Sequence, residues 1–151
     1  MYKLILLSFL SLFLFAQKIE INADLFKANK KDNIGIFTGN VFIKKENDFL
    51  QANEVRVIFN EKNVIIKYSA KDISDFKLSV NDKIITGKCK ELEYDVLKNI
   101  YELKGDVVLK EDKKELNAQL VKVNQKTGEY LVDSNKNNPV KFIFELNNAN
   151  N

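Results

Sequence analysis

Two stretches of this chain repeat each other in one ungapped register, and this internal repeat constrains the fold more than any other feature. The segment 37–41 (FTGNV) returns 66 positions later as 103–107 (LKGDV). The same register aligns these identical pairs: Asn33 and Asn99, Ile34 and Ile100, Lys44 and Lys110, Leu50 and Leu116, Ala52 and Ala118, Val55 and Val121, and Val57 and Val123. In such a repeat, one structural unit stacks on a copy of itself and covers its apolar face. The repeat therefore favours a scaffold or a binding surface over a single catalytic centre.

The composition is that of one folded domain. The chain has 151 residues, of which 45% are hydrophobic and 30% are charged, and Pro139 is its only proline. This length supports a single core, and nothing resembles a linker. The 24 Lys and Arg residues exceed the 21 Asp and Glu residues by only +3, and no nucleic-acid recognition motif is present. A nucleic-acid partner is therefore not expected.

The first 16 residues have the pattern of a secretory signal peptide. Lys3 supplies the positive charge, and an apolar run follows from position 4 to position 15. This run is shorter than the ~20 residues of a membrane-spanning helix. We expect cleavage after Ala16, so that the mature domain covers 17–146 and ends in a disordered polar tail, 147–151. An uncleaved anchor and a buried strand are the alternatives, because Leu14 stands where a small residue is usual.

The rest of the chain alternates apolar and polar residues with the period of a β-strand. Phe76, Leu78 and Val80 alternate with Lys77 and Ser79, and similar alternation recurs over 92–96, 101–109 and 142–146. Polar turn signals separate these runs. Their spacing is typical of antiparallel meanders and predicts roughly 11 to 16 short strands. We see no amphipathic helix in this part, so the sequence predicts an all-β antiparallel fold.

A switch in the alternation predicts where the sheet bends. The inward apolar residues are at even positions before the switch and at odd positions after it: Leu50, Ala52, Val55 and Val57 in the first copy, and Leu116, Ala118, Val121 and Val123 in the second. Such a switch marks a bulge or bend. Two switches at equivalent places predict a sheet that folds over at a corner in each repeat.

Gly39 and Gly105 lie in the middle of predicted strands at matched positions. Glycine in a strand marks either a bend or a close approach of another group. Two interpretations stay open from the residues alone. The glycines serve the backbone at a bend, or they leave space on the inner face for an apolar ligand.

The sequence lacks the usual equipment of an enzyme. It contains no histidine and one cysteine, Cys89, which is predicted to be a half-buried apolar side chain. These counts remove the commonest general base and metal ligand, as well as a thiolate zinc site. Glu91, Glu93 and Asp95 are interpreted as the solvated face of a strand. A glycan hydrolase that uses them as paired carboxylates is a minor alternative. No catalytic residue, metal site or cofactor is predicted.

The order of the short motifs resembles that of the OstA-like family. The motifs are 19–24 (IEINAD), 37–41 (FTGNV), 50–53 (LQAN), 105–107 (GDV) and 126–128 (KTG), and the resemblance covers about 18–146. It implies an elongated, twisted antiparallel β-jellyroll with an open apolar groove. It also implies a periplasmic protein that carries lipopolysaccharide or lipooligosaccharide between the two membranes, with the lipid A acyl chains in the groove. The implied partners are an inner-membrane LptC-like protein, the N-terminal β-jellyroll of the outer-membrane protein LptD, and other copies of the chain end to end.

Two sets of residues are candidates for these roles. The inward residues expected to contact acyl chains are Ile19, Ile21, Phe37, Val41, Phe76, Leu78, Leu92, Tyr94, Val96, Leu103 and Phe144. The residues expected on the edge strands that meet partners are Ile19, Ile21 and Asp24 at the beginning, and Val140, Phe142, Ile143, Phe144 and Leu146 at the end.

Two alternatives to this function remain at this point. One is a membrane-anchored, LptC-like component of the same pathway. The other is a structural or adaptor β-protein with a closed core. The closed core is distinguished by whether Phe76, Tyr94 and Phe142 face a sealed interior or an open groove.

Overall fold

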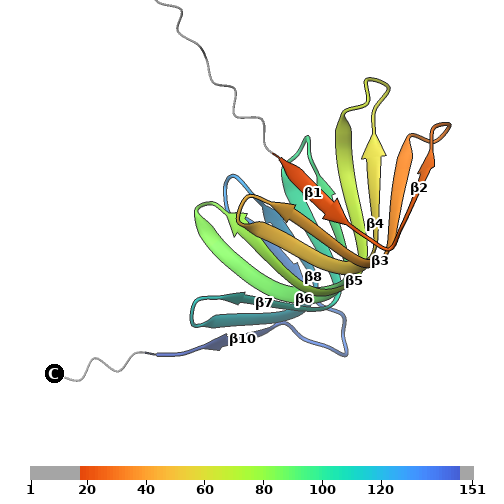
Figure 1. Cartoon of the computed structure of the whole chain (residues 1–151). Helices are drawn as coiled ribbons and strands as arrows, with labels where there is room; N and C mark the ends of the chain where they lie inside the picture. Colours follow the sequence, from red (N-terminus) through yellow and green to blue (C-terminus); the bar gives the residue numbers. More distant parts are fainter. Residues whose placement is uncertain (1–17, 147–151) are drawn as a thin grey trace, which may run out of the picture.

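The computed structural model describes residues 18–146, and this part of the chain is built from ten β-strands (Figure 1). They are β1 (Ile19–Asn22), β2 (Leu25–Asn29), β3 (Ile34–Lys45), β4 (Asp48–Phe59), β5 (Ile65–Val80), β6 (Lys83–Asp95), β7 (Ile100–Glu111), β8 (Lys114–Asn124), β9 (Tyr130–Asp133) and β10 (Lys141–Phe144). Across the described range, no helix is long and apolar enough to cross a membrane. The predicted signal peptide over 1–16 and the predicted polar tail over 147–151 lie outside these residues.

The strands form one antiparallel meander with two uncovered edges. The order in the sheet is β1-β3-β4-β5-β6-β7-β8-β10, while β2 also pairs with β3 and β9 also pairs with β8. β3 to β8 therefore follow one another through hairpins, as the alternation and the turn signals predicted. The predicted all-β antiparallel jellyroll is confirmed.

Each long strand bends, so that the single sheet becomes two facing limbs (Figure 1). We call limb A the part that contains β1, β10 and the halves of β3 to β8 in register with them; limb B contains β2, β9 and the other halves. At the bend the pairing register shifts along a line across the sheet: at Thr38/Val41, Gln51/Glu54, Ile73/Phe76, Lys88/Glu91 and Lys104/Val107. The corner in each repeat is thus where the alternation switches. The strands are fewer than the spacing predicted, because a long strand continues through the corner instead of ending there.

The repeated glycines create the bulges at this corner. Gly39 and Asn40 have φ values of 81° and 45°, and Gly105 and Asp106 have φ values of 78° and 46°. In both hairpins, these two residues oppose a single residue on the neighbouring strand. A side chain on Gly39 would collide with Asp24, whose carboxylate oxygen Oδ2 lies 2.6 Å from the position of a Cβ atom. The interpretation of these glycines as space for a ligand is wrong, because they serve the bend.

The two copies of the repeat share their backbone as well as their sequence. The β3–β4 hairpin turns at Glu46 with φ 55°, and the β7–β8 hairpin turns at Asp112 with φ 52°. In copy one, β1 and β2 together pair with β3, and in copy two β6 alone pairs with β7. The registers correspond: Glu20 pairs with Lys44, and Thr86 pairs with Lys110, which is the equivalent of Lys44 in copy two. Copy two therefore stacks on copy one through the long β5–β6 pair.

The core fills the space between the limbs near the corner. Its most deeply buried side chains are Val41, Val55, Val57, Phe76, Leu103, Val107 and Val121, and they come from both copies. Within the described range no polar or charged residue is buried with them. Burial of this apolar face is the main force that holds the two limbs together.

We predict that Gly39→Ala lowers the free energy of unfolding by about 1–2 kcal/mol, because alanine disfavours a positive φ and its methyl group meets Asp24. Gly35→Ala is the matched control, because Gly35 has no positive φ and its nearest neighbour is the exposed, movable ring of Phe26. Urea unfolding followed by circular dichroism measures both variants. Equal losses for the two substitutions would contradict the role given to the bulge.

Candidate functional site

The space between the limbs opens into a groove at the end of the molecule that carries the N-terminal strands. This large groove has a volume of about 490 Å³, within the range of pockets that hold small ligands. Its wall combines limb A residues from β1, β3, β4 and β5 with limb B residues from β4 to β7. The residues that line it are Ile19, Ile43, Lys45, Asp48, Phe49, Leu50, Phe59, Asn63, Val64, Ile65, Tyr68, Leu78, Leu92, Tyr94, Val96 and Tyr101.

A tight turn places an apolar side chain on the rim of this groove. The carbonyl oxygen Oδ1 of Asn60 accepts hydrogen bonds from the backbone N–H groups of Lys62 (2.9 Å) and Val64 (3.0 Å). Asparagine often closes turns in this way. Val64 is consequently held at the groove with 55% of its surface exposed. An exposed valine at the mouth of an apolar groove is available to a ligand.

Three tyrosines from neighbouring strands line the inner wall. Tyr68, Tyr94 and Tyr101 pair across β5, β6 and β7, with ring centroids 6.4 Å and 4.2 Å apart. Burial raises the pKa of all three hydroxyl groups, most strongly that of Tyr101. The Tyr94 hydroxyl donates a hydrogen bond to the side-chain oxygen Oε1 of Gln125, at 2.7 Å. The rings thus offer apolar faces to the groove.

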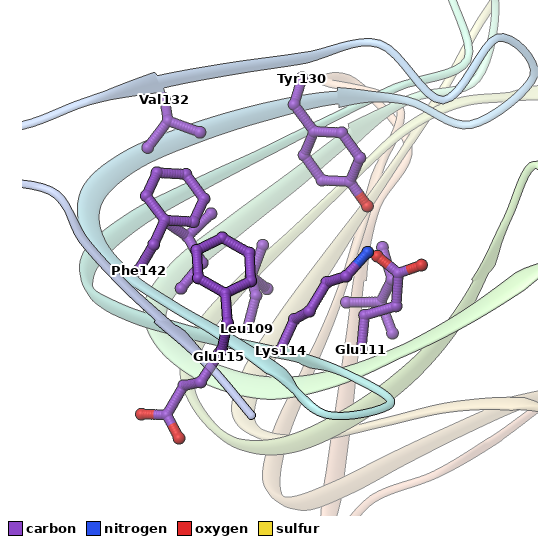
Figure 2. Close-up of a pocket in the computed structure, with 10 residues that line it drawn as sticks. Leu109, Glu111, Lys114, Glu115, Tyr130, Val132 and Phe142 are labelled. Carbon is purple, nitrogen blue, oxygen red and sulfur yellow. The ribbon is translucent and has the colours of Figure 1, made fainter. Parts of the chain in front are cut away.

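A second, smaller pocket of about 240 Å³ lies at the opposite end, beside β9 and β10 (Figure 2). Figure 2 shows Tyr130 and Val132 on one side of it and Phe142 on the other, while Lys114 reaches towards Tyr130 and Glu111. Its lining is mainly apolar: Ile85, Leu109, Leu116, Tyr130, Val132, Phe142 and Phe144, together with Glu111, Lys114 and Glu115. We call this space the small pocket.

The two spaces are separated by a constriction in the middle of the molecule. Phe76 and Leu103 are almost fully buried there, and the remaining space has a volume of about 10 Å³. This narrow space shares Leu78 and Tyr101 with the large groove. It shares Ile85 and Leu109 with the small pocket. The interior is therefore open at both ends and closed at its centre.

The predicted acyl-chain residues are distributed over all of these regions. Ile19, Leu78, Leu92, Tyr94 and Val96 line the large groove, and Phe144 lines the small pocket. Val41, Phe76 and Leu103 are buried in the core, while Ile21 and Phe37 are partly buried against it. Tyr94 and Phe142 thus border open spaces, whereas Phe76 faces a nearly sealed interior.

Several groove residues were not predicted from the sequence. Tyr68 lies in the stretch 65–70, where the alternation of apolar and polar residues is too weak to show which side chains face inward. The structure places it opposite Tyr94 on the neighbouring strand. Tyr101 shares the inward parity of Leu103, and that signal was sufficient to find it. Val64 lies in a turn, where strand alternation carries no information.

The edges of the sheet are more divided than expected. β1 and β10 are the predicted edges, but Asp24 lies at the bend between β1 and β2, and Val140 and Leu146 lie outside β10. β2 and β9 form the corresponding edges of limb B, and they were missed.

The acidic residues of β6 lie on the outer face of limb B, as predicted. Glu93 forms a salt bridge with Lys67 at 2.8 Å, and Glu102 beside it meets Lys104 and Lys122. Over residues 18–146, no group of three or more His, Cys, Asp or Glu side chains is placed to hold a metal ion. Cys89 is buried rather than half-buried, and its burial raises the pKa of the thiol to about 12.

Comparisons with known proteins agree with this architecture. Residues 20–129 match the family model described as LptA/(LptD N-terminal domain) LPS transport protein. The fold is similar to the crystal structure of LptH from Pseudomonas aeruginosa, described as the LptA homologous periplasmic component of the conserved lipopolysaccharide transport device. The TM-score is 0.75 and the identity 11%, over 86% of this chain and 96% of that chain. No curated protein sequence matches this chain.

Because the Tyr101 hydroxyl is buried, we expect the free energy of unfolding to fall at alkaline pH. Because its pKa is raised in the folded state, its contribution is present below the unfolded pKa of ~10 and is lost as the pH rises above that value. We predict that Tyr101→Phe makes the alkaline fall of the unfolding free energy shallower while keeping the ring beside Tyr94. Urea titrations at a series of pH values measure this slope. An identical slope in the parent and the variant would contradict the assignment.

Proposed function

We propose that this chain, which belongs to the LptA/LptD N-terminal domain family of lipopolysaccharide transport proteins, carries lipopolysaccharide or lipooligosaccharide through the periplasm with its acyl chains in the large groove. The observation that supports this most directly is the groove itself, an open space of about 490 Å³ between two apolar limbs. A protein that only joins partners has no need for such a space. The apolar lining offers the environment that an acyl chain prefers to water.

Apart from the tyrosine hydroxyl groups, the polar side chains of the groove come from the β3–β4 and β4–β5 hairpin turns that border it. Lys45, Asp48 and Asn63 are the polar lining residues that have no aromatic ring. Asp48 already accepts a hydrogen bond from the Ser79 hydroxyl at 2.6 Å. In this proposal the sugar headgroup stays outside the limbs and meets these polar side chains. The protein acts as a carrier and catalyses no reaction.

We predict that Val64→Asp weakens lipid binding about tenfold or more, because a carboxylate would lose hydration among acyl chains and each 1.4 kcal/mol is a factor of ten. The matched control is Ile84→Asp, since Ile84 has nearly the same exposure, 54% against 55%, and does not line the large groove. Binding of purified lipooligosaccharide, measured by a fluorescent-lipid displacement assay, compares the two variants. Equal weakening by both would contradict the proposed site.

A photo-crosslinking probe gives the same site an independent test. A benzoylphenylalanine at Val64 is expected to capture lipooligosaccharide, and one at Glu93 is not, because Glu93 lies on the outer face in a salt bridge with Lys67. Intact circular dichroism spectra are the control for folding. Equal capture at the two positions would show that the lipid does not distinguish the groove from the surface.

We further propose that the chain assembles end to end and meets its pathway partners through the open edges. The long β5–β6 pair already joins copy one to copy two within the molecule. In the proposed contact between two molecules, β9 and β10 of the first molecule take the place that β5 has in this pair. β1 and β2 of the second molecule take the place of β6. Such a contact is heterologous, so it can extend into a filament or be completed by a related β-jellyroll. The partners proposed for these edges are an LptC-like protein and the N-terminal domain of LptD.

The hydrogen-bond pattern of β10 determines the best test of this edge. The backbone N–H of Glu145 donates to the carbonyl oxygen of Lys113 in the direction of β8, at 3.1 Å. In an antiparallel ladder this direction alternates, so the N–H of Ile143 also points to β8 and that of Phe144 points away from it. Phe144, not Ile143, is therefore the position at which a proline removes only an outward donor.

We predict that Phe144→Pro abolishes self-association, while Phe144→Ala retains more of it. Both variants lose the exposed ring. Only the proline variant also loses the outward N–H group, which would donate a hydrogen bond to a carbonyl oxygen of a neighbouring strand. Light scattering over a range of protein concentrations measures the assembly. Equal assembly by the two variants would exclude strand pairing at β10.

A further inference from the structure

Two turns from opposite limbs meet across the mouth of the interior. The backbone N–H of Asn81, in the β5–β6 turn of limb A, donates to the carbonyl oxygen of Gln125 at the end of β8, at 2.9 Å. The Asn81 side chain donates to the carbonyl oxygen of Thr127 at 3.4 Å, and the Gln125 side chain donates to that of Ser79 at 3.3 Å. We call this set of contacts the bridge. It links limb A and limb B at their tips, far from the corner.

The bridge lies over the constriction. Val80 precedes Asn81, and Val123 lies two residues before Gln125. Both valines are buried, and both line the narrow space beside Phe76 and Leu103. The large groove lies on one side of this point and the small pocket on the other. In the described chain, therefore, the bridge and the valines beneath it close the path between the two spaces.

The geometry points to the small pocket as a second acyl-chain compartment, which we propose is reached from the large groove only when the bridge opens. This inference rests on the proposed function of the large groove. The occupant is an acyl chain of the same lipid, because the small pocket continues the same apolar interior through Leu78, Tyr101, Ile85 and Leu109. Two of its charged lining residues already have partners outside the pocket, because Glu111 pairs with Lys83 at 3.3 Å and Glu115 with Lys110 at 4.0 Å.

The bridge is the part of the constriction that is built to open. It consists of a few polar contacts between two turns, and exposed turns open at lower free energy than a packed core. The corner on the other side is fixed by the continuous backbone of six bent strands. When the bridge parts, the limb tips separate and the valines beneath it move away from each other.

Tyr94 connects the large groove to the bridge. Its ring lines the groove, and its hydroxyl donates to the side chain of Gln125. The same Gln125 holds the β5–β6 turn through Ser79 and Asn81. A chain that displaces the Tyr94 ring therefore disturbs the hydrogen bonds of the bridge. Occupancy of the first compartment thereby favours opening towards the second.

An engineered disulfide locks the bridge reversibly. A Cβ atom on Gly128 would lie 3.2 Å from the Cβ atom of Asn81, slightly closer than the ~3.5–4.5 Å of a disulfide. The double variant Asn81→Cys/Gly128→Cys therefore closes the bridge under oxidation and frees it under reduction. The native Cys89 does not compete, because it is buried and holds its thiol protonated. The single variants Asn81→Cys and Gly128→Cys are the controls for oxidation.

Photo-crosslinking in the two compartments reports where purified lipooligosaccharide lies. One probe replaces Val64 in the large groove, and a second protein carries the probe at Tyr130 in the small pocket. With the disulfide closed, we expect undiminished capture at Val64 and a fall at Tyr130 to the background seen at Glu93. Reduction of the disulfide should restore capture at Tyr130.

The possible failures are distinguishable. Capture at Tyr130 that is unaffected by the closed disulfide overturns the gated passage, because the pocket then fills from its own open end. Absence of capture at Tyr130 in the reduced protein overturns the second compartment. Absence of capture at Val64 in every form overturns the proposed function itself. If the positive φ of 74° at Gly128 prevents the cysteine variant from folding, Asn81→Ala/Gln125→Ala provides the opposite test. It removes the side-chain hydrogen bonds to Thr127, Ser79 and Tyr94 and leaves only the backbone one, so that capture at Tyr130 is expected to rise.

Discussion

The bulge at the corner turns a single meander into two facing limbs. At Gly39–Asn40 and again at Gly105–Asp106, two residues with positive φ oppose one residue of the neighbouring strand. The bend allows one meander to supply both walls of an interior, and no second sheet is needed. Every long strand then contributes an apolar face to limb A and another to limb B. A single sheet without these bends would leave the same apolar residues in water.

A meander folded in this way needs a packed core for its stability and an open space between the limbs for a ligand. The core near the corner is tightly filled, and Phe76 and Leu103 have almost no exposed surface there. At the N-terminal end, the limb tips stay apart, and the aromatic wall of Tyr68, Tyr94 and Tyr101 borders a groove. The protein therefore obtains its stability from the centre and keeps its open space at the ends. The contact between Asn81 and Gln125 marks the transition between these two regions.

The sequence was sufficient to predict the architecture but not the depth of the interior. The repeat, the alternation and its switch at Ala52–Val55 located the strands and the corner, because these features are local. Alternation shows which side of a strand faces inward, but it cannot show how far away the opposite limb lies. Phe76 and Tyr94 were both predicted to face a groove, yet only Tyr94 does so. The difference arises from the distance to the corner: Phe76 lies at the register shift of β5, inside the packed core, whereas Tyr94 lies near the far end of β6, where the limbs stand apart.

The proposed carrier role requires acyl chains to lie between the two limbs in the large groove. The most direct test is an isotope-filtered NMR experiment on the protein in complex with lipooligosaccharide. We predict nuclear Overhauser contacts from the acyl methylene protons to the rings of Tyr68 and Tyr94, and none to the outward side chain of Ile84. Contacts to Ile84 without contacts to the two tyrosine rings would place the lipid outside the groove and exclude this role.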